Sequence, residues 1–71
     1  MWNKRNPNWW FCKLKSNTSA WMCVWWDGEY GIWDQTDGLD PIRVANGYER
    51  DMEQAVKVVE RVAVNKGYRK A

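Results

Sequence analysis

Four short runs rich in aromatic or β-branched residues lie in the first two thirds of the chain. They span residues 9–15, 20–26, 29–33 and 42–45. Turn-forming residues separate the runs: residues 16–19 are a polar loop, and Asp27-Gly28 is typical of a two-residue type I′ turn. Residues 34–41, which contain Gly and Pro, read as a longer loop. This pattern predicts an antiparallel sheet of three or four strands over residues 9–45.

The hydrophobic period changes in the last third of the chain, where apolar side chains recur every three or four residues. They are Met52, Ala55, Val56, Val59, Val62 and Ala63. This spacing places them on one side of an amphipathic helix, which we predict over residues 49–66. A capping residue at Asp51 or, earlier, at Asn46 can start the helix, and Gly67 can end it.

Together these segments predict the α+β class: a three- to four-stranded antiparallel sheet, in βββα or ββββα order, with one C-terminal amphipathic helix packed on one face. The chain has 71 residues, which limits it to a single small domain. Seven Trp, three Tyr and one Phe supply buried area that so short a chain otherwise lacks. Residues 1–8 are expected to form a loose N-terminal arm, and residues 67–71 a tail.

The predicted loops also decide which side chains share a side of the sheet, because neighbours along a strand alternate between its two faces. A loop at residues 16–19 sets Cys12 opposite Cys23, and a turn at Asp27-Gly28 then adds Tyr30 and Ile32 to the same side. The first face would hold Trp10, Cys12, Leu14, Trp21, Cys23, Trp25, Tyr30 and Ile32. The second would hold Trp9, Phe11, Lys13, Met22, Val24, Trp26, Glu29, Gly31 and Trp33. We expect the helix to cover the first face, because it carries no charged residue.

A single helix covers a single face, so the second face is expected to present an exposed aromatic patch. Its members are Trp9, Phe11, Trp26 and Trp33. Contiguous apolar patches of several hundred Å² usually mark interaction sites, and Trp is enriched among interface hot spots. The alternatives are a register shifted by one residue, or burial of this face beneath residues 1–8 and 34–41. The leading hypothesis is a non-enzymatic module that binds a protein partner, or a second copy of itself, through this patch.

The net charge is +2, but the charges are unevenly placed along the chain. Five carboxylates follow one another without a basic residue between them: Asp27, Glu29, Asp34, Asp37 and Asp40. We expect this acidic stretch to tune specificity by facing a basic partner. It does not match the EF-hand spacing, so a solvated loop is preferred over a calcium site. The predicted partner-binding residues are Trp9, Phe11, Trp26, Trp33, Lys13, Asp27, Glu29, Asp34 and Asp37.

Single-stranded nucleic acid is the alternative ligand. Aromatic rings on an open sheet stack bases, and Lys13 and Lys15 can meet phosphates. Against this hypothesis, Glu29 shares the predicted face, and the chain lacks an overall basic surface and an RNP-like sequence. A structural homodimer with no other ligand is the third hypothesis.

Few groups in the chain carry reactive chemistry. Two Cys and no His exclude a four-ligand Cys/His zinc site within one chain. Cys12 and Cys23, if directly opposed, meet the spacing of a disulfide, but in a reducing compartment two buried thiols are the preferred interpretation. No paired acid and base can be located, so we predict no catalytic residue, no cofactor, no metal and no enzyme activity.

The N-terminal sequence does not resemble a secretory signal, because Lys4 and Arg5 precede polar residues. The longest apolar run, residues 20–26, is much shorter than the roughly 20 residues of a membrane-spanning helix. A cytoplasmic protein without a membrane partner is therefore expected. Small, Trp-rich proteins without catalytic groups resemble, in type, the accessory factors of phages and mobile elements that bind or inhibit a host protein. That resemblance implies a host protein as the partner.

Overall fold

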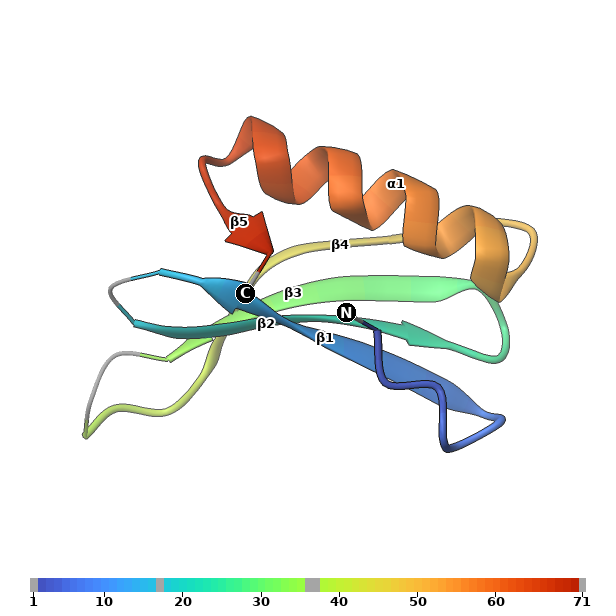
Figure 1. Cartoon of the computed structure of the whole chain (residues 1–71), viewed down its shortest axis with the longest axis horizontal. Helices are drawn as coiled ribbons and strands as arrows, with labels where there is room; N and C mark the ends of the chain where they lie inside the picture. The colour runs from blue at the N-terminus through green and yellow to red at the C-terminus, as the bar shows by residue number, and fades with distance from the viewer. Residues whose placement is uncertain (1, 17, 36–37, 71) are drawn as a thin grey trace.

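The computed structural model describes residues 2–16, 18–35 and 38–70, which form a sheet with one helix on one side (Figure 1). The elements are β1 (Trp9–Lys15), β2 (Ser19–Trp25), β3 (Glu29–Gln35), β4 (Ile42–Tyr48), α1 (Met52–Asn65) and β5 (Arg69–Lys70). The strand order is β4-β3-β2-β1-β5, and every neighbouring pair is antiparallel. The predicted α+β class, with a C-terminal helix on one face of an antiparallel sheet, is confirmed.

The sheet includes two segments beyond the predicted residues 9–45, and both come later in the chain. β4 continues through Gly47, which pairs with Tyr30. A Cβ on this glycine would lie 2.3 Å from the Tyr30 hydroxyl oxygen, so the tyrosine side chain occupies the space that a larger residue would need. Gly47 is therefore a packing position within a strand. The second segment, β5, lies in the predicted tail and pairs with Leu14 and Lys15 of β1.

The loop between β2 and β3 differs from the predicted type I′ turn. That turn needs a positive φ at both Asp27 and Gly28. Gly28 has one, at 88°, whereas no non-glycine residue of the described chain does. The Gly28 N–H donates to the C=O of Trp25 at 2.9 Å, within a loop formed by residues 26–28. The loop between β1 and β2 also occupies three positions, 16–18, instead of the predicted four.

These two loops shift β2 by one residue relative to the prediction. Cys12 pairs with Met22 and not with Cys23, and Trp10 pairs with Val24. One loop is shorter than predicted and the other is longer, so the two shifts cancel at β3. The predicted sides of β1 and β3 are therefore retained, whereas β2 turns its other side toward the helix.

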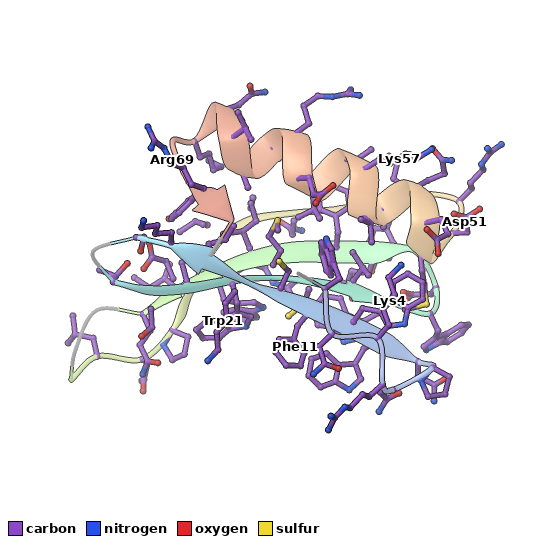
Figure 2. The ribbon with its side chains drawn as sticks, in the orientation of Figure 1. Lys4, Phe11, Trp21, Asp51, Lys57 and Arg69 are labelled. Atoms are coloured by element: carbon purple, nitrogen blue, oxygen red, sulfur yellow. The ribbon has the colours of Figure 1, made fainter. Side chains whose placement is uncertain are left out.

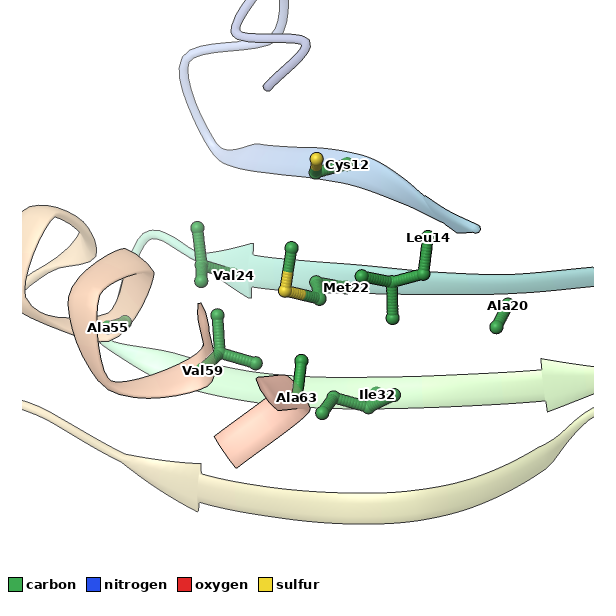
Figure 3. Packing of buried hydrophobic residues seen from close by; sticks show 9 residues of the cluster. All are labelled: Cys12, Leu14, Ala20, Met22, Val24, Ile32, Ala55, Val59 and Ala63. Atoms are coloured by element: carbon green, nitrogen blue, oxygen red, sulfur yellow. The ribbon is translucent and has the colours of Figure 1, made fainter. Parts of the chain in front are cut away.

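The core lies between the sheet and α1 (Figure 3). The buried cluster consists of Cys12, Leu14, Ala20, Met22, Val24, Ile32, Ala55, Val59 and Ala63. The helix contributes only Ala and Val to this cluster, and such small side chains let the helix approach the sheet closely. Trp21 and Trp25 were predicted to face the helix, and this prediction is wrong because the register of β2 sends them to the opposite side.

The ends of α1 follow two of the sequence signals. Asp51 is the N-cap, and its carboxylate accepts the backbone N–H of Gln54 at 2.9 Å. Gly67 follows the C-cap residue Lys66 with a φ of 89°, the left-handed conformation that ends many helices. Of the two predicted starts, the one at Asp51 is confirmed, and the helix begins at Met52 instead of residue 49.

The N-terminal arm, predicted to be loose, makes specific contacts with the helix and with β1. The Trp2 indole N–H donates to the Glu60 carboxylate at 3.1 Å. Asn3 and Phe11 exchange two backbone hydrogen bonds, of 2.7 and 3.2 Å. The Lys4 Nζ lies 4.4 Å from the centroid of the Trp10 ring, which itself packs against the core. Residues 2–4 therefore lie along the outer edge of β1 and against the helix.

Gly28→Ala is expected to destabilise the fold more than Gly67→Ala. Both glycines have nearly the same positive φ, but a Cβ on Gly28 would lie 1.9 Å from the Glu49 carbonyl oxygen, whereas nothing lies within 4 Å of one on Gly67. Gly67→Ala should cost about 1–2 kcal/mol through its backbone conformation. Gly28→Ala should cost about 1–3 kcal/mol more through the clash. Urea unfolding of the two variants measures the difference, and equal losses would contradict the steric explanation.

Candidate functional site

The side of the sheet that faces away from α1 carries most of the tryptophans, and we call it the open face. It receives Trp9, Phe11, Lys13 and Lys15 from β1, Ser19, Trp21, Cys23 and Trp25 from β2, Glu29, Gly31, Trp33 and Gln35 from β3, Arg43, Asn46 and Tyr48 from β4, and Arg69 from β5. In Figure 2 the side chains of Phe11 and Trp21 point to the side of the sheet opposite α1. Four of the seven tryptophans therefore share this face.

The rings surround a hollow in the middle of the open face. Cys23 lines it as a small residue that lies between Trp21 and Trp25 along the same side of β2. The hollow has a volume of about 410 Å³ and is lined by Trp9, Trp21, Cys23, Trp25, Trp33 and Pro41. A second hollow of about 280 Å³ is lined by Trp9, Phe11, Lys13 and Trp21. The first hollow falls in the range of roughly 300–1,000 Å³ that is usual for binding pockets.

The rings of the open face also contact one another. Trp9 and Phe11 stack with centroids 5.2 Å apart and an interplanar angle of 26°. Trp9 pairs across the strands with Trp25, and Trp21 pairs with Trp33. Such cross-strand pairs contribute about 0.2–1 kcal/mol each to a sheet. Four of the five rings that line the hollows are consequently half-buried, while Trp9 keeps 38% of its surface exposed.

A β-bulge in β4 brings Arg43 onto the open face. The pairing with β3 shifts by one residue between Ile32 and Trp33, so that Arg43 lies opposite Trp33. Val44 and Ala45, the next two residues, both pack against the core. In a regular ladder Arg43 would face α1, because side chains alternate along the strand.

Arg43 contacts two of the tryptophans and one carboxylate. Its guanidinium carbon lies 4.9 Å from the centroid of the Trp33 ring and 5.7 Å from that of the Trp25 ring. A cation within about 6 Å of a ring centroid is attracted by about 0.5–1 kcal/mol at exposed sites. The Arg43 Nη1 also donates to Glu29 Oε2 at 3.4 Å. Glu29 therefore has a cation beside it although no basic residue interrupts the acidic stretch, because Arg43 is distant in sequence but adjacent in space.

The predicted carboxylates do not gather on one surface. The Asp27 side chain accepts the backbone N–H of Glu29 at 3.0 Å, within the β2–β3 loop. Asp34 lies on the helix side of the sheet, and Asp37 lies outside the described residues. Of Asp27, Glu29 and Asp34, only Glu29 is on the open face, where Arg43 partners it.

Asp34 joins the C-terminal segment to the sheet. Its carboxylate accepts hydrogen bonds from the hydroxyl of Thr18 and, at 2.5 Å, from the hydroxyl of Tyr68. These two hydrogen bonds lower the pKa of Asp34. The hydrogen bond that Tyr68 donates to Asp34, together with burial, raises the pKa of Tyr68 to about 12. Asp34 therefore has a structural role that its position in an acidic stretch did not indicate.

Trp26, a predicted member of the patch, lies in the β2–β3 loop with 70% of its surface exposed. Its backbone N–H donates to the C=O of Asn8 at 2.8 Å. Trp21 and Trp25, which the sequence prediction missed, lie on the open face instead. The available signal was Gly28, since a three-residue hairpin loop also needs glycine at its last position.

The two cysteines lie on opposite sides of the sheet. Cys12 belongs to the core, whereas Cys23 forms part of the hollow in the open face. Both thiols are free and buried, in agreement with the preferred interpretation. Burial raises the pKa of the Cys23 thiol to about 11. Because a thiol in this state carries almost no thiolate at neutral pH, Cys23 serves as a small neutral side chain.

Within residues 2–16, 18–35 and 38–70, no group of three or more His, Cys, Asp or Glu residues is placed to hold a metal ion. In the same part of the chain, no helix has both the length and the apolar character needed to cross a membrane. No protein-family model matches the chain, and comparisons with curated proteins and with solved structures also found no match.

Tyr68→Phe is expected to remove a stabilising contribution that depends on pH. The pKa of Tyr68 is raised in the folded chain from 10 to about 12, so its hydrogen bond to Asp34 stabilises the fold below about pH 10 and is lost as the pH rises toward 12. The variant should lose about 1 kcal/mol near pH 8. The difference from the wild-type chain should shrink above pH 10. Urea unfolding across this range checks the trend, and a difference that does not depend on pH would contradict it.

Proposed function

We propose that this chain is a non-enzymatic protein-binding module that docks an acidic partner protein on the open face. The observation that carries the proposal is the aromatic hollow around Cys23, which α1 does not cover. Arg43 lies over two of its rings, and Lys13 lines the second hollow of the same face. In this proposal a large apolar side chain of the partner enters the hollow. Carboxylates around that side chain meet Lys13 and Lys15.

The ring contacts favour a protein over single-stranded nucleic acid. A base-stacking platform needs free ring faces. Here Trp9 and Phe11 stack on each other, and the Arg43 guanidinium lies over Trp25 and Trp33. Much of the stacking area is thus used within the molecule. The hollow between the rings suits an inserted side chain better than a row of flat bases.

The charges favour an acidic partner over a second copy. The strand residues of the open face include four positive side chains, Lys13, Lys15, Arg43 and Arg69, and one negative side chain, Glu29. Four charges against one leave a net +3. Two copies laid face to face would bring like charges together, whereas carboxylates on a partner would complement them. The proposal therefore replaces the basic partner expected from the sequence with an acidic one.

The wider role also belongs to the proposal. A cytoplasmic accessory protein of phage or mobile-element type, which binds a host protein through one surface, agrees with a small chain that presents an aromatic hollow. An acidic host protein has the charge opposite to that of the open face.

Trp9→Ala and Trp26→Ala are a matched pair of variants, because both side chains are exposed and only Trp9 lies on the open face. The probe is a library of random linear peptides of roughly 12 residues, longer than a usual β-strand, selected on the wild-type chain. We expect the selected peptides to share a large apolar residue flanked by Asp or Glu. Trp9→Ala should lower their affinity about tenfold or more, as at an interface hot spot, and Trp26→Ala should leave it unchanged.

Fluorescence anisotropy with the labelled peptides measures these affinities, and urea unfolding verifies that both variants fold. Equal losses from the two variants, or selected peptides rich in Lys and Arg, would overturn the proposal.

Reversing two charges on the open face is expected to weaken peptide binding without loss of stability. The variant is Lys13→Glu with Lys15→Glu, and its control is Lys57→Glu with Lys66→Glu, which places the same change on α1 and its C-cap. All four lysines are exposed, so stability should change by no more than about 0.5 kcal/mol per site. Only the first variant should lose affinity for the acidic peptides.

Two further measurements separate the rival ligands. An oligo-dT strand of about 20 nucleotides, bound with a steep dependence on salt, would identify nucleic acid as the ligand and overturn the protein proposal. Sedimentation of the wild-type chain at micromolar concentration should show a monomer. A dimer that the charge-reversal variant abolishes would identify a second copy as the occupant.

A further inference from the structure

The two edges of the sheet differ in what covers them. At the β1 edge, Asn3 exchanges backbone hydrogen bonds with Phe11, and β5 pairs with Leu14 and Lys15. At the other edge β4 is the outermost strand, and among the described residues the ladder ends there. An uncovered edge presents unpaired N–H and C=O groups that a further strand can satisfy.

The hydrogen-bonding phase of β4 shows which of its backbone groups point outward. The Glu49 N–H donates to the C=O of Gly28 at 2.9 Å, so Gly28 and Glu49 form a hydrogen-bonded pair. The next pair along the ladder is Glu29–Tyr48. Hydrogen-bonded and non-hydrogen-bonded pairs alternate along an antiparallel ladder. Tyr48 and Asn46 therefore occupy non-hydrogen-bonded pairs with β3, and their backbone N–H and C=O groups point to the free edge.

This part of β4 lacks the features that usually prevent an edge strand from pairing with another chain. β4 contains no Lys and no Pro, and its single basic residue, Arg43, is turned onto the tryptophans of the open face. The bulge lies at the other end of the strand, beyond Ala45. Tyr48 has 63% of its surface exposed, and Ile42 has 64%. Natural edge strands are commonly protected by charge, by proline or by irregularity.

We infer that the partner docks by adding an extended segment to the edge of β4, pairing with the backbone of Asn46 and Tyr48. This inference rests on the proposed protein-binding function and specifies how the partner is held. Backbone hydrogen bonds supply affinity in strand addition, and side chains that alternate along the strand supply specificity. Side chains of the added segment that point to the open-face side extend that face beside Tyr48, so one partner can contact the edge and the open face together.

A second copy is a weaker occupant of this edge. Pairing of β4 with another β4 joins one strand to one strand, and a stable interface usually buries about 800 Å² on each partner. Such pairing would also set two positively charged open faces side by side. An acidic partner that spans both the edge and the hollow avoids both difficulties.

The test compares Asn46→Pro with Asn46→Ala, using the peptides selected on the wild-type chain. Both variants lose the same exposed amide side chain, but only proline removes the outward N–H. Proline is tolerated on edge strands at such positions. Asn46→Pro should lower peptide affinity about tenfold or more, whereas Asn46→Ala should change it less than about twofold. Hydrogen exchange on the wild-type chain should show the Asn46 and Tyr48 amides becoming protected when peptide binds.

Each outcome decides a different point. If Asn46→Pro binds as tightly as Asn46→Ala, or if neither amide gains protection, strand addition is overturned, while a loss in Trp9→Ala still supports docking on the open face. If no peptide depends on Trp9, the proposed function falls and strand addition falls with it. A wild-type dimer that Asn46→Pro converts to a monomer would assign the edge to a second copy. If Asn46→Pro does not fold, the exchange measurement on the wild-type chain decides the question.

Discussion

The pairing register of β2 is the constraint on which the binding surface depends. β2 lies between β1 and β3, and its side chains alternate between the core and the open face. With Met22 and Val24 beneath α1, Trp21 and Trp25 must lie on the other side, where they complete the group of rings around Cys23. A shift of one residue would exchange these sets and bury two tryptophans where the helix now approaches closely. Two three-position loops hold the register.

The open face is an electrostatic unit as well as an apolar one. Glu29 alone would make an unpaired negative charge among tryptophans, but Arg43 lies beside it and also over two rings. This arrangement leaves Lys13, Lys15 and Arg69 as the charges available to a ligand. The positive character of the face therefore comes from contacts between strands and not from the order of charges along the chain, where the carboxylates stand together.

Features that depend on local sequence were predictable, and features that depend on spatial neighbours were not. The helix followed from its apolar period, and its ends from Asp51 and Gly67, because each of these signals acts within a few residues. The sides of β1 and β3 were predicted correctly only because two errors in loop length cancelled. The sides of β2 were wrong, since Asp27-Gly28 fits a two-residue turn and a three-residue loop almost equally well. No local sequence pattern indicated the position of Arg43 or the hydrogen bond from Tyr68 to Asp34.

The bulge in β4 has a consequence for the kind of ligand that such a sheet can accept. It consists of one additional residue, Val44, between Arg43 and Ala45. If the same sequence paired with β3 without the bulge, Arg43 would lie on the helix side, and the Trp25 and Trp33 rings would lose the guanidinium that lies over them. Glu29 would then lose the cation that lies beside it. The bulged pairing of β4 therefore decides whether this sheet offers a cationic recess for a side chain or a pair of open stacking surfaces.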